Sequence, residues 1–141
     1  MIDELKAGIY DKVTNSSFID YLNGGIYAEE YPQTTTSVSY PNIVYYRVTN
    51  TPYKDSHGYF EPVHLQFNIY VDDREVNSLA GIALRDFLEG QFTDLMDDAV
   101  LTVSGYGNLR CKREFTHPIP NMNEDRIKGV AIGYLIELEK I

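Results

Sequence analysis

Apolar residues recur along the chain at two spacings, which separate expected helices from expected strands. Near the N-terminus they fall three or four positions apart, which predicts a helix over 3–15 and a short turn to Leu22, ended by Asn23-Gly24-Gly25. Over 62–71 they alternate with polar residues, which predicts a strand with one buried face. We expect the buried face of that strand to carry Val63, Leu65, Phe67, Ile69 and Val71.

The same reasoning places the other elements. A capping-box pattern at 72–75 begins a second helix over 74–91, and Gly90 is expected to end it. The expected apolar stripe of this helix is Val76, Leu79, Ala80, Ala83 and Phe87, with Leu84 at its margin. Residues rich in β-branched and aromatic side chains predict further strands over 26–31, 42–50, 100–104, 109–115 and 130–139.

Two long connections complete this layout. Residues 51–60 contain Pro52, Asp55 and Gly58, which predicts a long hairpin arm. Residues 116–129 hold two prolines and are expected to form a long loop. The order α-β-β-β-α-β-β-β predicts one α+β domain over 1–141, with a mostly antiparallel sheet and both helices on one face.

The second face of such a sheet would be exposed in a monomer. Tyr46, Tyr70 and Leu135 are expected on it, which favours a partner at this surface. The sequence holds 12 tyrosines and no tryptophan, and tyrosine suits both half-buried strands and protein interfaces.

Composition narrows the possible functions. The chain has 141 residues, 43% of them hydrophobic, and a single cysteine, so we expect no internal disulfide and a reducing compartment. The acidic start has no signal-peptide pattern, and no apolar run is long enough to span a membrane, so we expect no membrane partner. The net charge of −9 disfavours tight binding to nucleic acid, which needs lysine and arginine at the phosphates.

No combination of residues predicts chemistry. The side chains weighed for it are His57, His64, His117, Cys111, Asp94, Asp97 and Asp98. The histidines lack the paired spacing of metal ligands, and the aspartates are interpreted as a solvated turn in preference to a calcium site. Cys111 lies between two basic residues, yet alternation favours a buried structural thiol. We therefore expect no enzymatic activity, no cofactor and no metal.

A resemblance makes the functional expectation specific. In order along the chain it rests on Gly25-Ile26-Tyr27, Pro32, the strand 41–48, Gln66-Phe67-Asn68-Ile69-Tyr70 and the helix 76–88. This pattern, over 5–138, resembles the tail-terminator and tail-completion family of long-tailed double-stranded DNA phages. The resemblance implies a virion protein of the tail, assembled in the host cytoplasm as a hexameric ring. The ring would cap the tail tube, stop polymerisation of the tube protein and dock the head's connector, with DNA passing through without specific binding.

Interface residues follow from this expectation. The arm over 51–60 is expected to contact a neighbouring subunit or the tube through Tyr53, Tyr59 and Phe60. The residues expected to line the ring lumen are Gln66, Asn68, Glu137 and Glu139. A plain solvent-facing sheet explains the same four residues. Two other functions stay open: a head-completion protein between portal and tail, and a small α+β ligand-binding or enzymatic domain.

Overall fold

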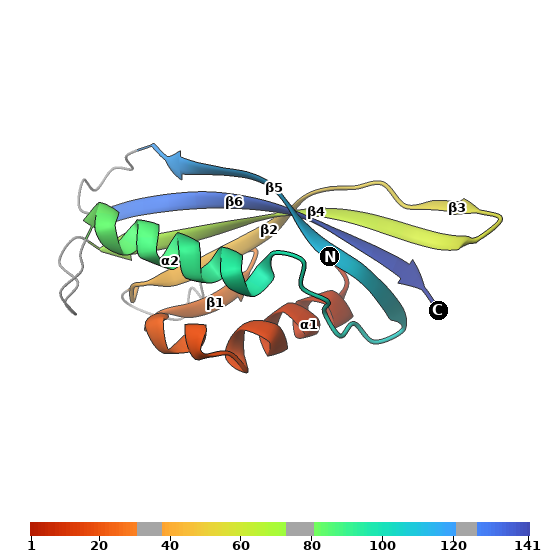
Figure 1. Cartoon of the computed structure of the whole chain (residues 1–141), viewed down its shortest axis with the longest axis horizontal. Coiled ribbons are helices and arrows are strands. Elements are labelled where there is room, and N and C mark those ends of the chain that lie inside the picture. The colour runs from red at the N-terminus through yellow and green to blue at the C-terminus, as the bar shows by residue number, and fades with distance from the viewer. Residues whose placement is uncertain (31–37, 73–80, 121–126) are drawn as a thin grey trace.

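The computed structural model describes residues 1–30, 38–72, 81–120 and 127–141 (Figure 1). One twisted sheet forms a layer, and two α-helices lie side by side on one of its faces. The elements are α1 (Asp3–Thr14), the 3-10 helix η1 (Ser17–Tyr21), β1 (Gly25–Ala28), β2 (Asn42–Asn50), β3 (Tyr53–Asp55), β4 (Gly58–Asp72), α2 (Gly81–Met96), β5 (Tyr106–Ile119) and β6 (Ile127–Lys140).

The sheet has the strand order β1-β2-β4-β6-β5, with the short β3 paired to the start of β4. Only the β1–β2 pair is parallel, and the other pairs among the described strands are antiparallel. The long central pair of β4 and β6 runs from Tyr59↔Lys140 to Asp72↔Ile127. The predicted α+β class, with a mostly antiparallel sheet, is confirmed.

The core lies between the helices and the facing side of the sheet. The alternation predicted over 62–71 is confirmed, because its apolar residues are buried while the polar residues between them point to the other side. At its centre the Phe67 ring lies 5.0 Å from the Tyr45 ring, 5.1 Å from Phe92 and 5.9 Å from Tyr134, measured between centroids. The helices add Leu5, Ile9, Val13, Leu84, Leu88, Phe92 and Met96.

The second helix differs from its prediction. It does not end at Gly90 but continues to Met96, and its buried side is built from residues four apart: Leu84, Leu88, Phe92 and Met96. Glycine costs an interior helix position about 1 kcal/mol, which the burial of two further large side chains outweighs. Ala83 is exposed, so its predicted place in the apolar stripe was wrong, and Leu84, predicted at the margin, is buried, whereas Phe87 packs against the core as expected. The members of the stripe at 76, 79 and 80, and the helix start at 73–75, lie outside the described residues.

The strands also differ from their predictions in four places. Residues 100–104 form no strand and contribute only the bridge Val103↔Tyr106. The loop predicted over 116–129 is wrong, because β5 continues to Ile119 and β6 begins at Ile127. Proline at 118 is tolerated in β5, since β5 is the edge of the sheet. The first strand stops at Ala28, before the predicted end at 31.

Candidate interaction surface

The side of the sheet turned away from α1 and α2, here called the open face, carries neutral polar and aromatic side chains. Gln66 Nε2 donates a hydrogen bond to Asn68 Oδ1 at 2.9 Å, and Asn68 Nδ2 donates to the Tyr70 hydroxyl at 3.2 Å. Tyr46 of β2 is 36% exposed beside this row of β4 side chains. Leu135 of β6 pairs with His64 of β4 and faces the same side of the sheet. Tyr46, Tyr70 and Leu135 thus share the face on which they were predicted.

Small residues of β6 shape one half of the open face. Gly129, Ala131 and Gly133 alternate along β6 and are buried. Ile119 of β5 and Tyr70 of β4 lie over Gly129, and Phe115 of β5 lies over Gly133. The Phe115 ring occupies the space where a side chain at position 133 would stand. Phe115 stacks on His117 with centroids 5.3 Å apart. The missing side chain at Gly133 therefore leaves the space that the Phe115 ring fills.

Substitution Gly133→Ala is expected to displace the Phe115 ring. A new methyl group in a packed position costs about 1–3 kcal/mol of unfolding free energy, measured by urea denaturation. In a Phe115→Ala background the same substitution should cost less than about 0.5 kcal/mol. An equal cost in both backgrounds would mean that the penalty comes from the β6 backbone and not from the ring.

The arm is the second part of the surface. The β3–β4 hairpin extends beyond the region covered by the helices (Figure 1). Tyr53 and Phe60 stack on it with centroids 5.3 Å apart, and Tyr53 is 51% exposed. Tyr59 lies on the opposite side, where Lys140 Nζ is 5.9 Å from its ring centroid and its hydroxyl donates to Glu61 at 3.4 Å. The structure therefore brings together two of the three predicted arm residues and separates the third.

The residues predicted to line a lumen share one side of the sheet. Gln66 and Asn68 lie on the open face, and Asn68 is only 9% exposed. Glu137 and Glu139 pair with Pro62 and Phe60, so the register places both glutamates on the same face toward the arm. The open face thus carries neutral polar side chains along β2 and β4, Lys112 and the His64–Glu114 pair toward β5, and two glutamates at its arm end.

The residues weighed for chemistry are dispersed. Within the described ranges, no group of three or more His, Cys, Asp or Glu side chains is placed to hold a metal ion. His64 Nδ1 lies 2.7 Å from Glu114 Oε1 on the open face, and Cys111 is buried. No helix in the described part of the chain is both long enough and apolar enough to cross a membrane.

Asp97 has a structural role that sequence reasoning missed. Its Oδ1 accepts a 2.7 Å hydrogen bond from the Tyr134 hydroxyl, and its Oδ2 lies 3.3 Å from Arg113 Nη2. Burial, and then the hydrogen bond to Asp97, raise the pKa of Tyr134 far above its ordinary value, so the hydroxyl stays a donor. Asp97 therefore ties the end of α2 to β5 and β6.

Substitution Tyr134→Phe is expected to cost about 2 kcal/mol of unfolding free energy, as for a hydrogen bond to a charged group. Chemical denaturation measures it. The matched control is Tyr46→Phe, whose ring is partly exposed and which should change stability by less than about 0.5 kcal/mol. Equal effects at both positions would contradict a specific role for Asp97.

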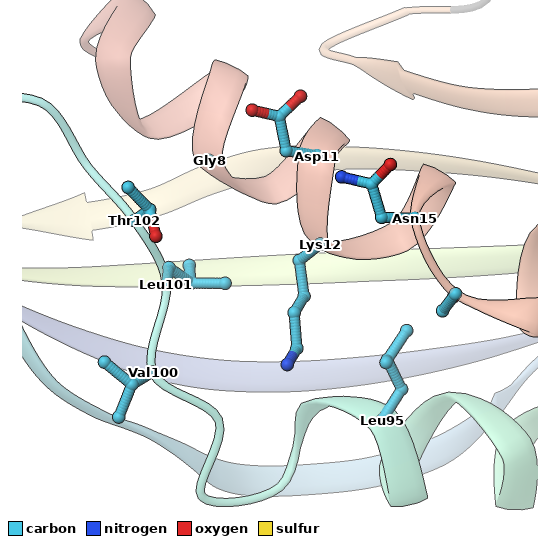
Figure 2. Close-up of a pocket in the computed structure, with 9 residues that line it drawn as sticks. Gly8, Asp11, Lys12, Asn15, Leu95, Val100, Leu101 and Thr102 are labelled. Carbon is cyan, nitrogen blue, oxygen red and sulfur yellow. The ribbon is translucent and has the colours of Figure 1, made fainter.

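A hollow of about 340 Å³ lies between α1, the end of α2 and residues 100–102 (Figure 2). The Lys12 side chain points from α1 toward Leu95 and Val100, whereas the Asp11 side chain points away from these two residues. The acid and the base do not converge, so the hollow offers no acid–base pair. Its apolar rim includes Val100, which is 62% exposed.

Comparison with known proteins adds a shared fold. No protein-family model matches the sequence, and no curated protein matches it significantly. A solved structure described as "Virion of native gene transfer agent (GTA) particle" contains a chain of similar fold. The TM-score is 0.75 at 12% sequence identity, over 96% of this chain and 94% of that one. At this identity the similarity establishes the architecture.

Proposed function

We propose that this chain is a virion structural protein that caps a tail tube as a hexameric ring, ends tube polymerisation and forms the docking surface for the head. The observation that carries the proposal is the fold shared, over nearly the whole of both chains, with a chain of a virion particle. The order of sequence elements that resembles phage tail terminators supports the same function independently. The proposal includes no catalysis and no cofactor.

The surface of the chain suits a conduit for DNA. A wall that lets DNA pass must not hold phosphates, and a chain with 21 acidic and 12 basic residues meets that condition. We assign the lumen to the open face, with Gln66 and Asn68 at its middle and Glu137 and Glu139 toward the arm. The chain would line the passage without binding its contents.

The arm supplies a contact to a neighbouring subunit or to the tube. Tyr53 and Phe60 form a stacked aromatic pair beyond the region that the helices cover, and aromatic residues are enriched in interface cores. Tyr59, on the other side of the arm, would contact a different part of the assembly. Contacts of this kind are heterologous, and they close into a ring when the rotation between copies allows it.

The double substitution Tyr53→Ala and Phe60→Ala tests this contact. We expect the free energy of association to fall by about 2 kcal/mol or more, as for interface hot spots. In native mass spectrometry the variant should therefore need a higher protein concentration than the wild type to form rings. Folding of the monomer should change little, because Tyr53 is half exposed. Val100→Ala, at another exposed apolar position, is the control. Intact rings together with a collapse of thermal stability would place the aromatic pair in the fold and not in the interface.

A further inference from the structure

The two ends of the strand order, β1 and β5, are the edges at which an added strand would extend the sheet. β5 is the longer edge, with 14 residues against four in β1. Along an antiparallel pair, successive residues turn their backbone N–H and C=O groups alternately toward the partner strand and away from it. The groups that β5 turns away from β6 therefore decide whether another strand is able to join.

Backbone pairing shows that Pro118 points away from β6. Cys111 N donates a 2.9 Å hydrogen bond to Ala99 O, so the backbone groups of Cys111 face away from β6, and those of its register partner Ile136 face β4. β6 pairs with β4 without a register shift, so Val130, at an even spacing from Ile136, also faces β4. Val130 is the register partner of Pro118. The backbone groups of Pro118 consequently lie on the outer edge of the sheet.

This outer position offers a joining strand no donor and an acceptor that is already engaged. Proline has no backbone N–H to donate. The Pro118 carbonyl oxygen lies 3.2 Å from Nδ1 of His117, and because a carbonyl only accepts, the His117 ring is the donor. The His117 ring is held by its stacking on Phe115, whose own ring fills the space at Gly133. The aromatic pair on the open face thus covers the outward carbonyl of the edge strand.

The rest of the outer edge of β5 is also interrupted. The segment at Cys111 is paired with residues 98–99, and a register shift between Arg113 and Phe115 breaks the alternation. Between Phe115 and Pro118, all of them described residues, only Thr116 turns both of its backbone groups outward. A single complete position is too short for a strand pair, which needs outward groups at several alternate positions.

The opposite edge of the sheet carries interruptions of its own. β1 has four residues, and directly after it Glu29 N donates a 2.6 Å hydrogen bond to Tyr45 O. The next stretch of β2 contains a register shift between Arg47 and Thr49. Short edge strands and bulges are features that keep sheet edges from pairing with each other. Both described edges of the sheet therefore carry such features.

We propose that Pro118 and His117 protect the β5 edge against strand addition, so that copies of this chain meet through side-chain surfaces such as the arm. A sheet continued from one copy to the next is then excluded at this edge. An unprotected edge would let copies add to one another without limit, because edge pairing is an open-ended contact. Edge protection does not depend on the proposed ring, since a monomer needs it equally.

Restoring a donor and freeing the acceptor tests the protection. The edge-opened chain carries Pro118→Thr, which returns a backbone N–H, and His117→Ala, which frees the carbonyl at position 118. Because two further backbone hydrogen bonds become possible, species larger than any wild-type assembly should begin to form at a protein concentration about tenfold or more below that of the wild type. Analytical ultracentrifugation measures this concentration. Hydrogen exchange of the Thr116 amide, which faces outward, should slow as these species form.

Two further variants complete the test. Pro118→Thr alone keeps the stacked rings in place, so it should shift association in the same direction by less, and it decides the matter if the double variant unfolds in thermal denaturation. Pro120→Thr, the same change beyond the end of β5, is the control and should behave as the wild type does.

Three results would overturn edge protection. The first is a folded edge-opened chain that associates no more than the wild type does. The second is association of that chain while the Thr116 amide still exchanges rapidly, because the contact would then lie elsewhere. The third is slow exchange of the Thr116 amide in wild-type assemblies, since the edge would already be paired. A wild-type chain that stays monomeric would contradict the proposed ring, and the edge-opened chain would still decide edge protection.

Discussion

Substitution Phe67→Ala is expected to lower the free energy of unfolding by about 3–5 kcal/mol, as large aromatic truncations in cores do. The Phe67 side chain is fully buried, and its ring meets those of Tyr45, Phe92 and Tyr134. Because β2, β4, β6 and α2 each contribute one of these four rings, the cavity would open where the layers meet. Urea denaturation followed by circular dichroism measures the loss.

The control for Phe67→Ala is Val48→Ala. Val48 is 51% exposed at an irregular position of β2, and its truncation should change stability by less than about 0.5 kcal/mol. A loss at Phe67 below about 1 kcal/mol would mean that the layers repack around the missing ring. The described core would then be looser than its packing indicates.

The second large effect follows from the tail capping proposed for this chain. Deleting its gene is expected to give tails of uncontrolled length that join no heads, because a stack of heterologous contacts continues until a subunit lacks the second surface. Electron microscopy of the lysate measures tail length and attachment. Complementation with the wild-type gene should restore uniform tails and infectivity, which serves as the control.

Other outcomes of the deletion discriminate between functions. Tails of normal length that lie detached beside filled heads would assign the chain to head completion between portal and tail. Normal infectious particles would contradict both virion functions and would favour a ligand-binding or enzymatic domain. Deletion therefore tests tail capping against each alternative that the sequence leaves open.

The elements predicted best are those with long and unambiguous periodicity. The helix ending near 15 and the strand 42–50 match α1 and β2, and the alternation over 62–71 identifies the buried face of β4. The extensions of β5 and β6 were missed because their signal is not local. Thr116–Ile119 includes a proline and Gly129 is a weak strand former, yet pairing with each other holds both segments in the sheet.

The candidate interaction surface was predicted only in part, because the sequence pattern shows the alternation along each strand but not the contacts between distant residues. A period of two correctly placed Tyr46, Tyr70 and Leu135 on one face, and applied to the arm it would also have separated Tyr59 from Phe60. The small residues Gly129, Ala131 and Gly133 alternate along β6, and this pattern could have indicated that side chains of neighbouring strands cover that face of β6. The contact of Asp97 with Tyr134 spans 37 residues, and no local pattern encodes it.

The most direct test of tail capping is a tube-length assay with purified components. The tail-tube protein that the proposed tail capping gives this chain as a partner is polymerised while this chain is added at increasing ratios, and tube lengths are measured by negative-stain electron microscopy. Tail capping predicts that tubes shorten as the ratio rises and that each shortened tube carries one ring at one end. Tube lengths that do not change at any ratio, with rings present in solution, would contradict it.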